Sequence, residues 1–193
     1  MPRPLFREFS DTNLPEIIYF DTSFILEVLI KGQRYHQECK DFIRRLEEKQ
    51  PIIVFSDLLK PELWCGTISV CIRNSFKGDV NVREMINRRP KLVKGYYNKI
   101  IRIQKDFSDL LQRFKDWTSI PINDKILDKA QHLMLKYCLG SYDAIHIATM
   151  EEWEIKDIAV FDQHIENIPN IKIWSVDAVS RYIKRKREGR ILE

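Results

Sequence analysis

Four acidic residues lie where predicted strands meet predicted helices, and as a group they have the chemistry of a metal site. Asp21 directly follows the apolar run at residues 17–20, and Asp162 directly follows a similar run. Glu62 and Asp143 stand in what should be the first turns of two helices. Taken one at a time, each acid has an ordinary explanation as a helix cap or as a charge that complements the helix dipole.

Jointly, the four acids predict a different role. In a parallel sheet all strands end at one edge and the following helices begin there, so the acids come to the same side of the domain. Carboxylates held close together raise one another's pKa values unless a cation lies between them. Oxygen ligands without His or Cys favour Mg²⁺ or Mn²⁺ over zinc. Such a site suits phosphodiester hydrolysis, because the metal orients the phosphate and lowers the pKa of an attacking water.

Two neighbours of these acids are also candidates. Ser23, two residues after Asp21, can donate to a carboxylate or to phosphate while it also caps the next helix. His146 lies three residues after Asp143, and we interpret it as a packing or supporting residue, since none of the histidines has metal-ligand spacing.

The elements that must position these residues follow an alternating pattern. Segments with helical periodicity separate the apolar runs, which is typical of a parallel α/β sheet flanked by helices. The predicted strands are residues 17–20, 52–55, 119–122, 158–161 and 171–174. Pro121 cannot donate to a strand ladder, so the third strand is expected at an edge. If the order is 3-2-1-4-5, Asp21 and Asp162 flank the topological switch point.

Length and composition bound the rest of the interpretation. The 193 residues, 44% of them hydrophobic, predict one domain over 1–193. The four cysteines form no Cys-x-x-Cys pair, so we expect buried or half-buried thiols in a reduced, cytoplasmic protein. No apolar stretch approaches the ~20 residues that cross a bilayer, so no membrane association is expected.

The charge is concentrated in one part of the chain. Residues 72–116 hold 12 Lys or Arg and 5 Asp or Glu, a net charge of +7, whereas the whole chain carries +4. We expect an extended basic helical insertion here, which suggests either a polyanionic partner or only a solvated helix surface. An apolar stripe from Tyr96 to Trp117 has heptad-like spacing, which predicts either a helix packed on its own core or a dimer or partner contact.

At these residues the chain resembles the PIN-domain nucleases, especially the VapC-type toxin ribonucleases of toxin-antitoxin pairs. The motifs that carry the resemblance occur in the family's order: Asp-Thr-Ser at 21–23, Pro-Glu-Leu at 61–63, Tyr-Asp-Ala-Ile-His-Ile-Ala at 142–148 and Phe-Asp-Gln-His-Ile at 161–165. One departure is Val160, where family members often have Thr or Ser two residues before the last acid.

The resemblance implies a three-layer α/β/α fold with a sheet of about five strands in the order 3-2-1-4-5. It also implies Mg²⁺-dependent cleavage of RNA by a site formed from Asp21, Glu62, Asp143 and Asp162. It further implies a homodimer and an antitoxin that covers the acidic pocket. Two alternatives stay open: a non-catalytic RNA- or protein-binding PIN module, and a PIN nuclease outside toxin-antitoxin systems that acts on DNA or in RNA maturation.

Overall fold

A single parallel sheet organises the protein. The computed structural model describes residues 5–76, 80–177, 180, 183–184 and 187. In this part of the chain, six strands pair in the order β1-β6-β5-β2-β3-β4, and every pairing is parallel. The strands are β1 (Leu5–Glu8), β2 (Ile17–Phe20), β3 (Ile52–Ser56), β4 (Trp117–Ile120), β5 (Asp157–Ala159) and β6 (Lys172–Ser175).

The helices connect these strands and cover the sheet. They are α1 (Thr22–Leu29), α2 (His36–Lys49), α3 (Leu59–Ser75), α4 (Val82–Arg88), α5 (Pro90–Gly95), α6 (Tyr97–Leu111), α7 (Asp124–Tyr137) and α8 (Ser141–Glu152). A short 3₁₀ helix, His164–Asn167, follows β5.

The order of the five expected strands is confirmed, because β4-β3-β2-β5-β6 is the predicted 3-2-1-4-5 arrangement. The expected strand count was too low. β1 is a sixth strand that pairs with β6 at the edge of the sheet, from Leu5 opposite Lys172 to Glu8 opposite Ser175. Its four residues include two charged ones and are not fully buried, so it lacks the apolar run by which the others were predicted.

Four of the five predicted strands differ from the structure in their bounds, and two of them differ by two residues at an end. The third strand is β4, which pairs Trp117 with Ile53 and ends at Ile120. Pro121 lies just beyond it, because proline has no N–H for the ladder. β4 is at an edge, as expected. The fourth strand, β5, ends at Ala159, so Asp162 lies in the loop after the strand and not directly at its end.

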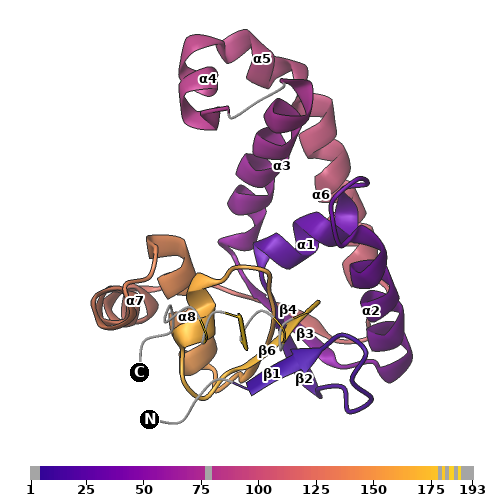
Figure 1. Cartoon of the computed structure of the whole chain (residues 1–193), viewed down its shortest axis with the longest axis vertical. Coiled ribbons are helices and arrows are strands. Elements are labelled where there is room, and N and C mark those ends of the chain that lie inside the picture. Colours follow the sequence, from indigo (N-terminus) through magenta and orange to yellow (C-terminus); the bar gives the residue numbers. More distant parts are fainter. Residues whose placement is uncertain (1–4, 77–79, 178–179, 181–182, 185–186, 188–193) are drawn as a thin grey trace.

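Alternate residues of the central strand face two apolar cores. Ile18 and Phe20 pack in a cluster that includes Phe24 of α1 and Phe42 of α2. Tyr19 belongs to a second cluster that includes the buried residues of α7 and apolar residues of α8. Because side chains alternate along a strand, these clusters must lie on opposite faces of the sheet. Figure 1 shows the same three layers, with α7 and α8 on one side of the strands and α1 and α2 on the other.

Helices α3 to α6 form an arm that rises from the sheet (Figure 1). The long helices α3 and α6 lie side by side, and α4 and α5 close the far end. That end has its own small core around Cys71, Ile72 and Tyr96. Most of the predicted heptad stripe is buried in the protein's own cores, whereas Trp117 is 47% exposed.

Other expectations from composition can be compared with the structure. All four cysteines are free; Cys39 and Cys71 are buried, but Cys65 and Cys138 are exposed, contrary to the prediction. No helix among the described residues combines the length and apolarity needed to span a bilayer. The single domain over 1–193 stays a prediction, and its ends at 1–4 and 188–193 lie outside the described residues.

Candidate active site

Asp21 is fixed by the turn that joins β2 to α1. It is the N-cap of α1 and is only 5% exposed. Its Oδ2 accepts hydrogen bonds from the Ser23 backbone N–H at 2.8 Å and from the Ser23 hydroxyl at 2.5 Å. The Ser23 oxygen in turn accepts from the Phe161 N–H at 3.0 Å, which ties the loop after β5 to the start of α1. Ser23 therefore orients Asp21 and joins the two chain segments that bring Asp21 and Asp162 together.

Glu62 is held in the first turn of α3 by two side chains from other elements. Its Oε2 accepts from the Thr22 hydroxyl at 2.5 Å and from Nε2 of His146 at 2.8 Å. The same His146 nitrogen lies 3.7 Å from Oδ1 of Asp21. One imidazole thus links Glu62 to Asp21 across residues that are far apart in the sequence.

His146 is a buried, fully engaged side chain, 1% exposed. Its Nδ1 lies 2.8 Å from the Tyr19 hydroxyl, which also accepts from the Ser56 N–H at 3.1 Å. Burial alone lowers the pKa of His146, but the Tyr19 oxygen, the hydrogen bond to Glu62 and the charges of Asp21 and Glu62 outweigh it and raise the pKa well above the ordinary value. A charged imidazole donates from both nitrogens, so His146 offsets the negative charge of the site.

Asp143 carries the clearest sign of crowded negative charge. It lies in the first turn of α8 and is half-buried. Burial, followed by the charges of Asp162 and Asp21, raises the pKa of Asp143 to about 6. Burial likewise raises the pKa of Asp21, although His146 and Ser23 act in the opposite direction. Four chain segments therefore bring carboxylates near enough to oppose one another's ionisation.

Asp162 has a local role as well as an electrostatic one. Its Oδ1 accepts from the His164 N–H at 2.8 Å, at the start of the 3₁₀ helix. Val160, the departure from the family motif, is fully buried in the core under α7 and α8, and its N–H donates to the Trp174 carbonyl at 3.2 Å. The position therefore contributes packing instead of a polar contact.

The four carboxylates are the type of ligand that a hard divalent cation prefers, but their side chains are not arranged around a common point. The donors of the site are carboxylate oxygens, and a cation would relieve the repulsion that helps to raise the pKa values of Asp21 and Asp143. Among the described residues, however, no three His, Cys, Asp or Glu side chains are grouped closely enough to hold an ion as they stand. Glu62 instead bonds Thr22 and His146, and Asp21 bonds Ser23. Metal binding at this site therefore requires a change in side-chain positions.

The structure places His146 as a supporting residue, as expected, and adds its partners: it connects Glu62 with Tyr19. The available signal was its spacing, because residues three apart share a helix face and Asp143 is on that face. The partners Thr22, Tyr19 and Ser56 had no comparable signal, since their contacts join positions distant in the chain.

Comparisons with known proteins identify the family of the chain. The PIN domain family model matches residues 18–171. Similar solved structures include Mycobacterium tuberculosis VapC20, described as a Sarcin-Ricin loop cleaving toxin, at 17% identity over 76% of this chain and 90% of that one, TM-score 0.49. Another is a toxin-antitoxin complex from Klebsiella pneumoniae, at 19% identity over 80% of this chain and 94% of that one, TM-score 0.49. No curated protein matches. Because the family model covers well over half of the 193 residues, the chain belongs to the PIN domain family.

Proposed function

We propose that this PIN domain protein is an endoribonuclease that hydrolyses RNA phosphodiester bonds with Mg²⁺ or Mn²⁺ bound by Asp21, Glu62, Asp143 and Asp162. The observation that carries the proposal is the convergence of the acids at one edge of the sheet: Glu62 and Asp21 lie 2.8 Å and 3.7 Å from the same His146 nitrogen, and Asp143 is close enough to Asp162 and Asp21 for their charges, with burial, to raise its pKa to about 6. A half-buried carboxylate opposed by two others is the environment that a divalent cation stabilises.

The residues of the chain have separable roles in this proposal. A bound Mg²⁺ or Mn²⁺ would supply Lewis-acid stabilisation of the phosphate and lower the pKa of the attacking water. Ser23 holds Asp21 in place through its hydroxyl and its N–H. His146 holds Glu62 and keeps a positive charge beside the acids. Asp143 would act as a metal ligand, because a bound cation would stabilise its ionised form against burial and the charges of Asp162 and Asp21.

The direct test is cleavage of a labelled RNA by purified wild type, Asp21→Asn and Asp143→Asn, each with Mg²⁺, with Mn²⁺ and with EDTA. Wild type is expected to cut only with metal, and both variants are expected to lose cutting while their melting curves stay cooperative. Asp128→Asn, an exposed acid on α7, is the matched control and should cut like wild type. Undiminished cleavage by both site variants rules the site out, and a matched DNA substrate tests the nucleic-acid class.

We also propose that the protein is the toxin of a toxin-antitoxin pair and acts as a homodimer. Membership of the PIN family and the ordered motifs at 21–23, 61–63, 142–148 and 161–165 support this placement. Induced expression in a bacterial host should stop growth for wild type and not for Asp143→Asn. Light scattering measures the oligomeric state, and growth unaffected by wild type contradicts the toxin role.

One observation favours a second candidate, a non-catalytic RNA- or protein-binding module. In the described part of the chain the site's side chains bond one another and no ready metal-binding group of three exists. Calorimetric titration with Mn²⁺ separates the two functions. Binding that is lost in Asp143→Asn supports the nuclease, whereas no heat at millimolar Mn²⁺ supports the module.

A further inference from the structure

The far end of the helical arm is a compact, strongly basic unit. We call residues 82–99, which comprise α4, α5 and the start of α6, the arm tip. It contains six Lys or Arg residues and a single acid, Glu84. Glu84 forms an ion pair with Arg88 at 2.8 Å. The arm tip has no second acid that could neutralise its other Lys and Arg side chains. Tyr96 anchors the tip in its own small core with Cys71 and Ile72.

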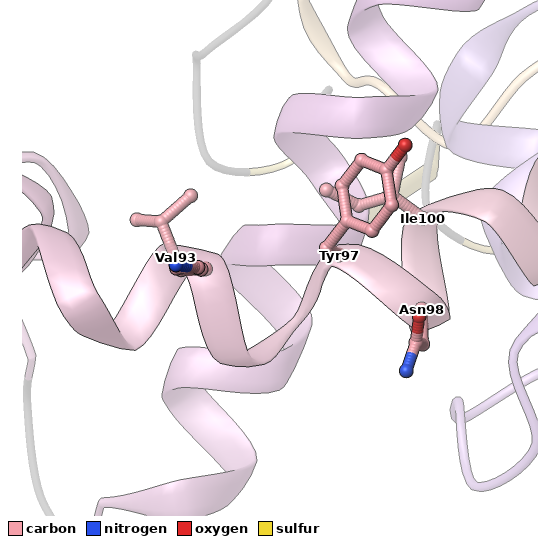
Figure 2. A pocket seen from close by; sticks show the side chains of 5 residues that line it. Val93, Tyr97, Asn98 and Ile100 are labelled. Carbon is pink, nitrogen blue, oxygen red and sulfur yellow. The ribbon is translucent and has the colours of Figure 1, made fainter.

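A hollow of about 450 Å³ opens on the arm tip. Val93, Lys94, Tyr97, Asn98 and Ile100 line it. Figure 2 shows Val93 and Tyr97 projecting from the same side of the helix pair, with Ile100 next to the Tyr97 ring. Tyr97 is 61% exposed, in contrast to its neighbour Tyr96, which is 8% exposed. The hollow therefore has an apolar wall, an available aromatic ring, an amide and a lysine.

This combination matches one class of ligand. Proteins that bind single-stranded nucleic acid combine cations that neutralise phosphates with aromatic rings on which bases stack. Lys94, which helps to line the hollow, is exposed on α5, and so is Lys91, which lies three residues earlier on the same helix. A second copy of the same basic tip would be repelled by like charge, so charge complementarity favours a polyanion.

We propose that the arm tip is a binding site for unpaired RNA, in which a base stacks on Tyr97 in the hollow while Lys91 and Lys94 neutralise adjacent phosphates. This inference deepens the proposed function, on which it rests for the identity of the nucleic acid as RNA. It assigns substrate binding to a surface away from the acids.

Helix α3 sets the length of RNA that can reach the four acids and the arm tip at the same time. Glu62 lies in its first turn, and Ser75, its last residue, contacts the arm tip, because the Ser75 and Tyr96 hydroxyls are 2.9 Å apart. At ~1.5 Å per residue this separation is roughly 20 Å. A stacked strand rises ~3.4 Å per nucleotide, so about six nucleotides must separate the scissile bond from the base at the tip. The predicted substrate is therefore an RNA with an unpaired segment about six nucleotides from the cut, and a stacked tetranucleotide is too short to reach the tip and the acids together.

The test is RNA binding by the full chain under conditions in which cleavage cannot interfere. The probes are a fluorescein-labelled single-stranded RNA of twelve nucleotides and one of four, measured by anisotropy in EDTA with Asp143→Asn as the parent protein. Adding Tyr97→Ala should weaken binding of the long RNA about tenfold, and Tyr97→Trp should restore it. Adding Lys91→Glu with Lys94→Glu should reduce the slope of log affinity against log salt by about 1.4.

Matched controls separate the tip from general charge and aromatic effects. Lys40→Glu with Arg44→Glu on α2 reverses two exposed cations elsewhere, and Trp153→Ala removes a ring that is 58% exposed at the end of α8. Both controls should bind the long RNA like the parent. The preference of the parent for the long RNA over the short one should disappear in the tip variants only.

The outcomes distinguish this proposal from the function on which it rests. If wild type cuts no RNA with metal but the tip variants lose binding as stated, the RNA-binding proposal is supported and the nuclease proposal is overturned. If wild type cuts RNA, yet the tip variants bind long RNA like the parent, the tip proposal is wrong. A change in oligomeric state on Tyr97→Ala, with RNA binding intact, would identify the hollow as a contact between copies and also overturn the proposal.

Discussion

Asp143→Asn is expected to stabilise the metal-free protein while it abolishes cleavage. The raised pKa of Asp143 means that its ionised form opposes folding, because burial and the charges of Asp162 and Asp21 disfavour it. Asparagine has nearly the same shape and no charge. The variant therefore removes an unfavourable interaction that the wild type retains whenever no cation is bound.

The magnitude follows from the pKa. A rise from 3.8 to about 6 corresponds to about 3 kcal/mol at ~1.36 kcal/mol per unit. Asp143 is only half-buried, so solvent screening reduces the expected gain to about 1.5 kcal/mol. For a chain of this size that is about 4 °C in melting temperature.

The pH dependence gives the sharpest check. Well below the unfolded pKa of 3.8 the carboxyl is protonated in the folded and the unfolded chain, so wild type and variant should be equally stable there. Wild type becomes less stable than Asp143→Asn as the pH rises through about 6, and the full difference in unfolding free energy should appear above pH 7.

The assay is urea unfolding in EDTA at several pH values, repeated with excess Mg²⁺ or Mn²⁺. Metal should stabilise wild type and narrow the difference, because only the folded wild type binds it well. Asp128→Asn serves as the control and should change stability by less than ~0.5 kcal/mol. The reasoning is refuted if Asp143→Asn is no more stable than wild type at pH 7.5 in EDTA, or if its advantage persists unchanged at pH 4.

Three further changes test the site and the core by the same unfolding measurement. Ser23→Ala removes the hydroxyl that bonds Asp21 and should cost about 2 kcal/mol, and a loss under ~0.5 kcal/mol contradicts the orienting role. His146→Gln takes a buried charge away from Glu62 and should cost about 3 kcal/mol, with an equal or higher stability counting against the charged imidazole. Phe42→Ala, which empties a fully packed core position, should cost about 4 kcal/mol, and a surface-like effect below ~1 kcal/mol would contradict its placement.

The sheet was largely predictable because its strands are apolar runs separated by helical segments, and short right-handed connections leave few possible orders. β1 escaped prediction because an edge strand is stabilised by backbone pairing with one neighbour and needs no apolar run. The strand limits at Ile120 and Ala159 depend on where pairing stops, which sequence patterns locate only approximately.

The candidate site was predictable only in part. Asp21, Glu62, Asp143 and Asp162 were found because the parallel topology sends all their elements to one edge. The contacts of His146 with Glu62 and Tyr19 depend on the positions of α3, α8 and β2 in three dimensions, which local spacing does not encode. The arm's basic charge was visible in the sequence, but its hollow was not, because the bend between α5 and α6 creates it.

Glu62 lies in the first turn of α3, and the arm tip lies beyond the other end of this helix. The length of the arm can therefore change without moving the acids. Lengthening α3 and its neighbour α6 by two turns each would carry the arm tip about 11 Å outward, because each turn adds ~5.4 Å, and would leave the first turn of α3 in place. With the arm tip binding RNA as proposed, the length of these two helices alone would set the distance along the RNA between the bound base and the acids. Under the proposed function, the arm offers a route for redirecting the protein to other RNA molecules without altering any of the four acids.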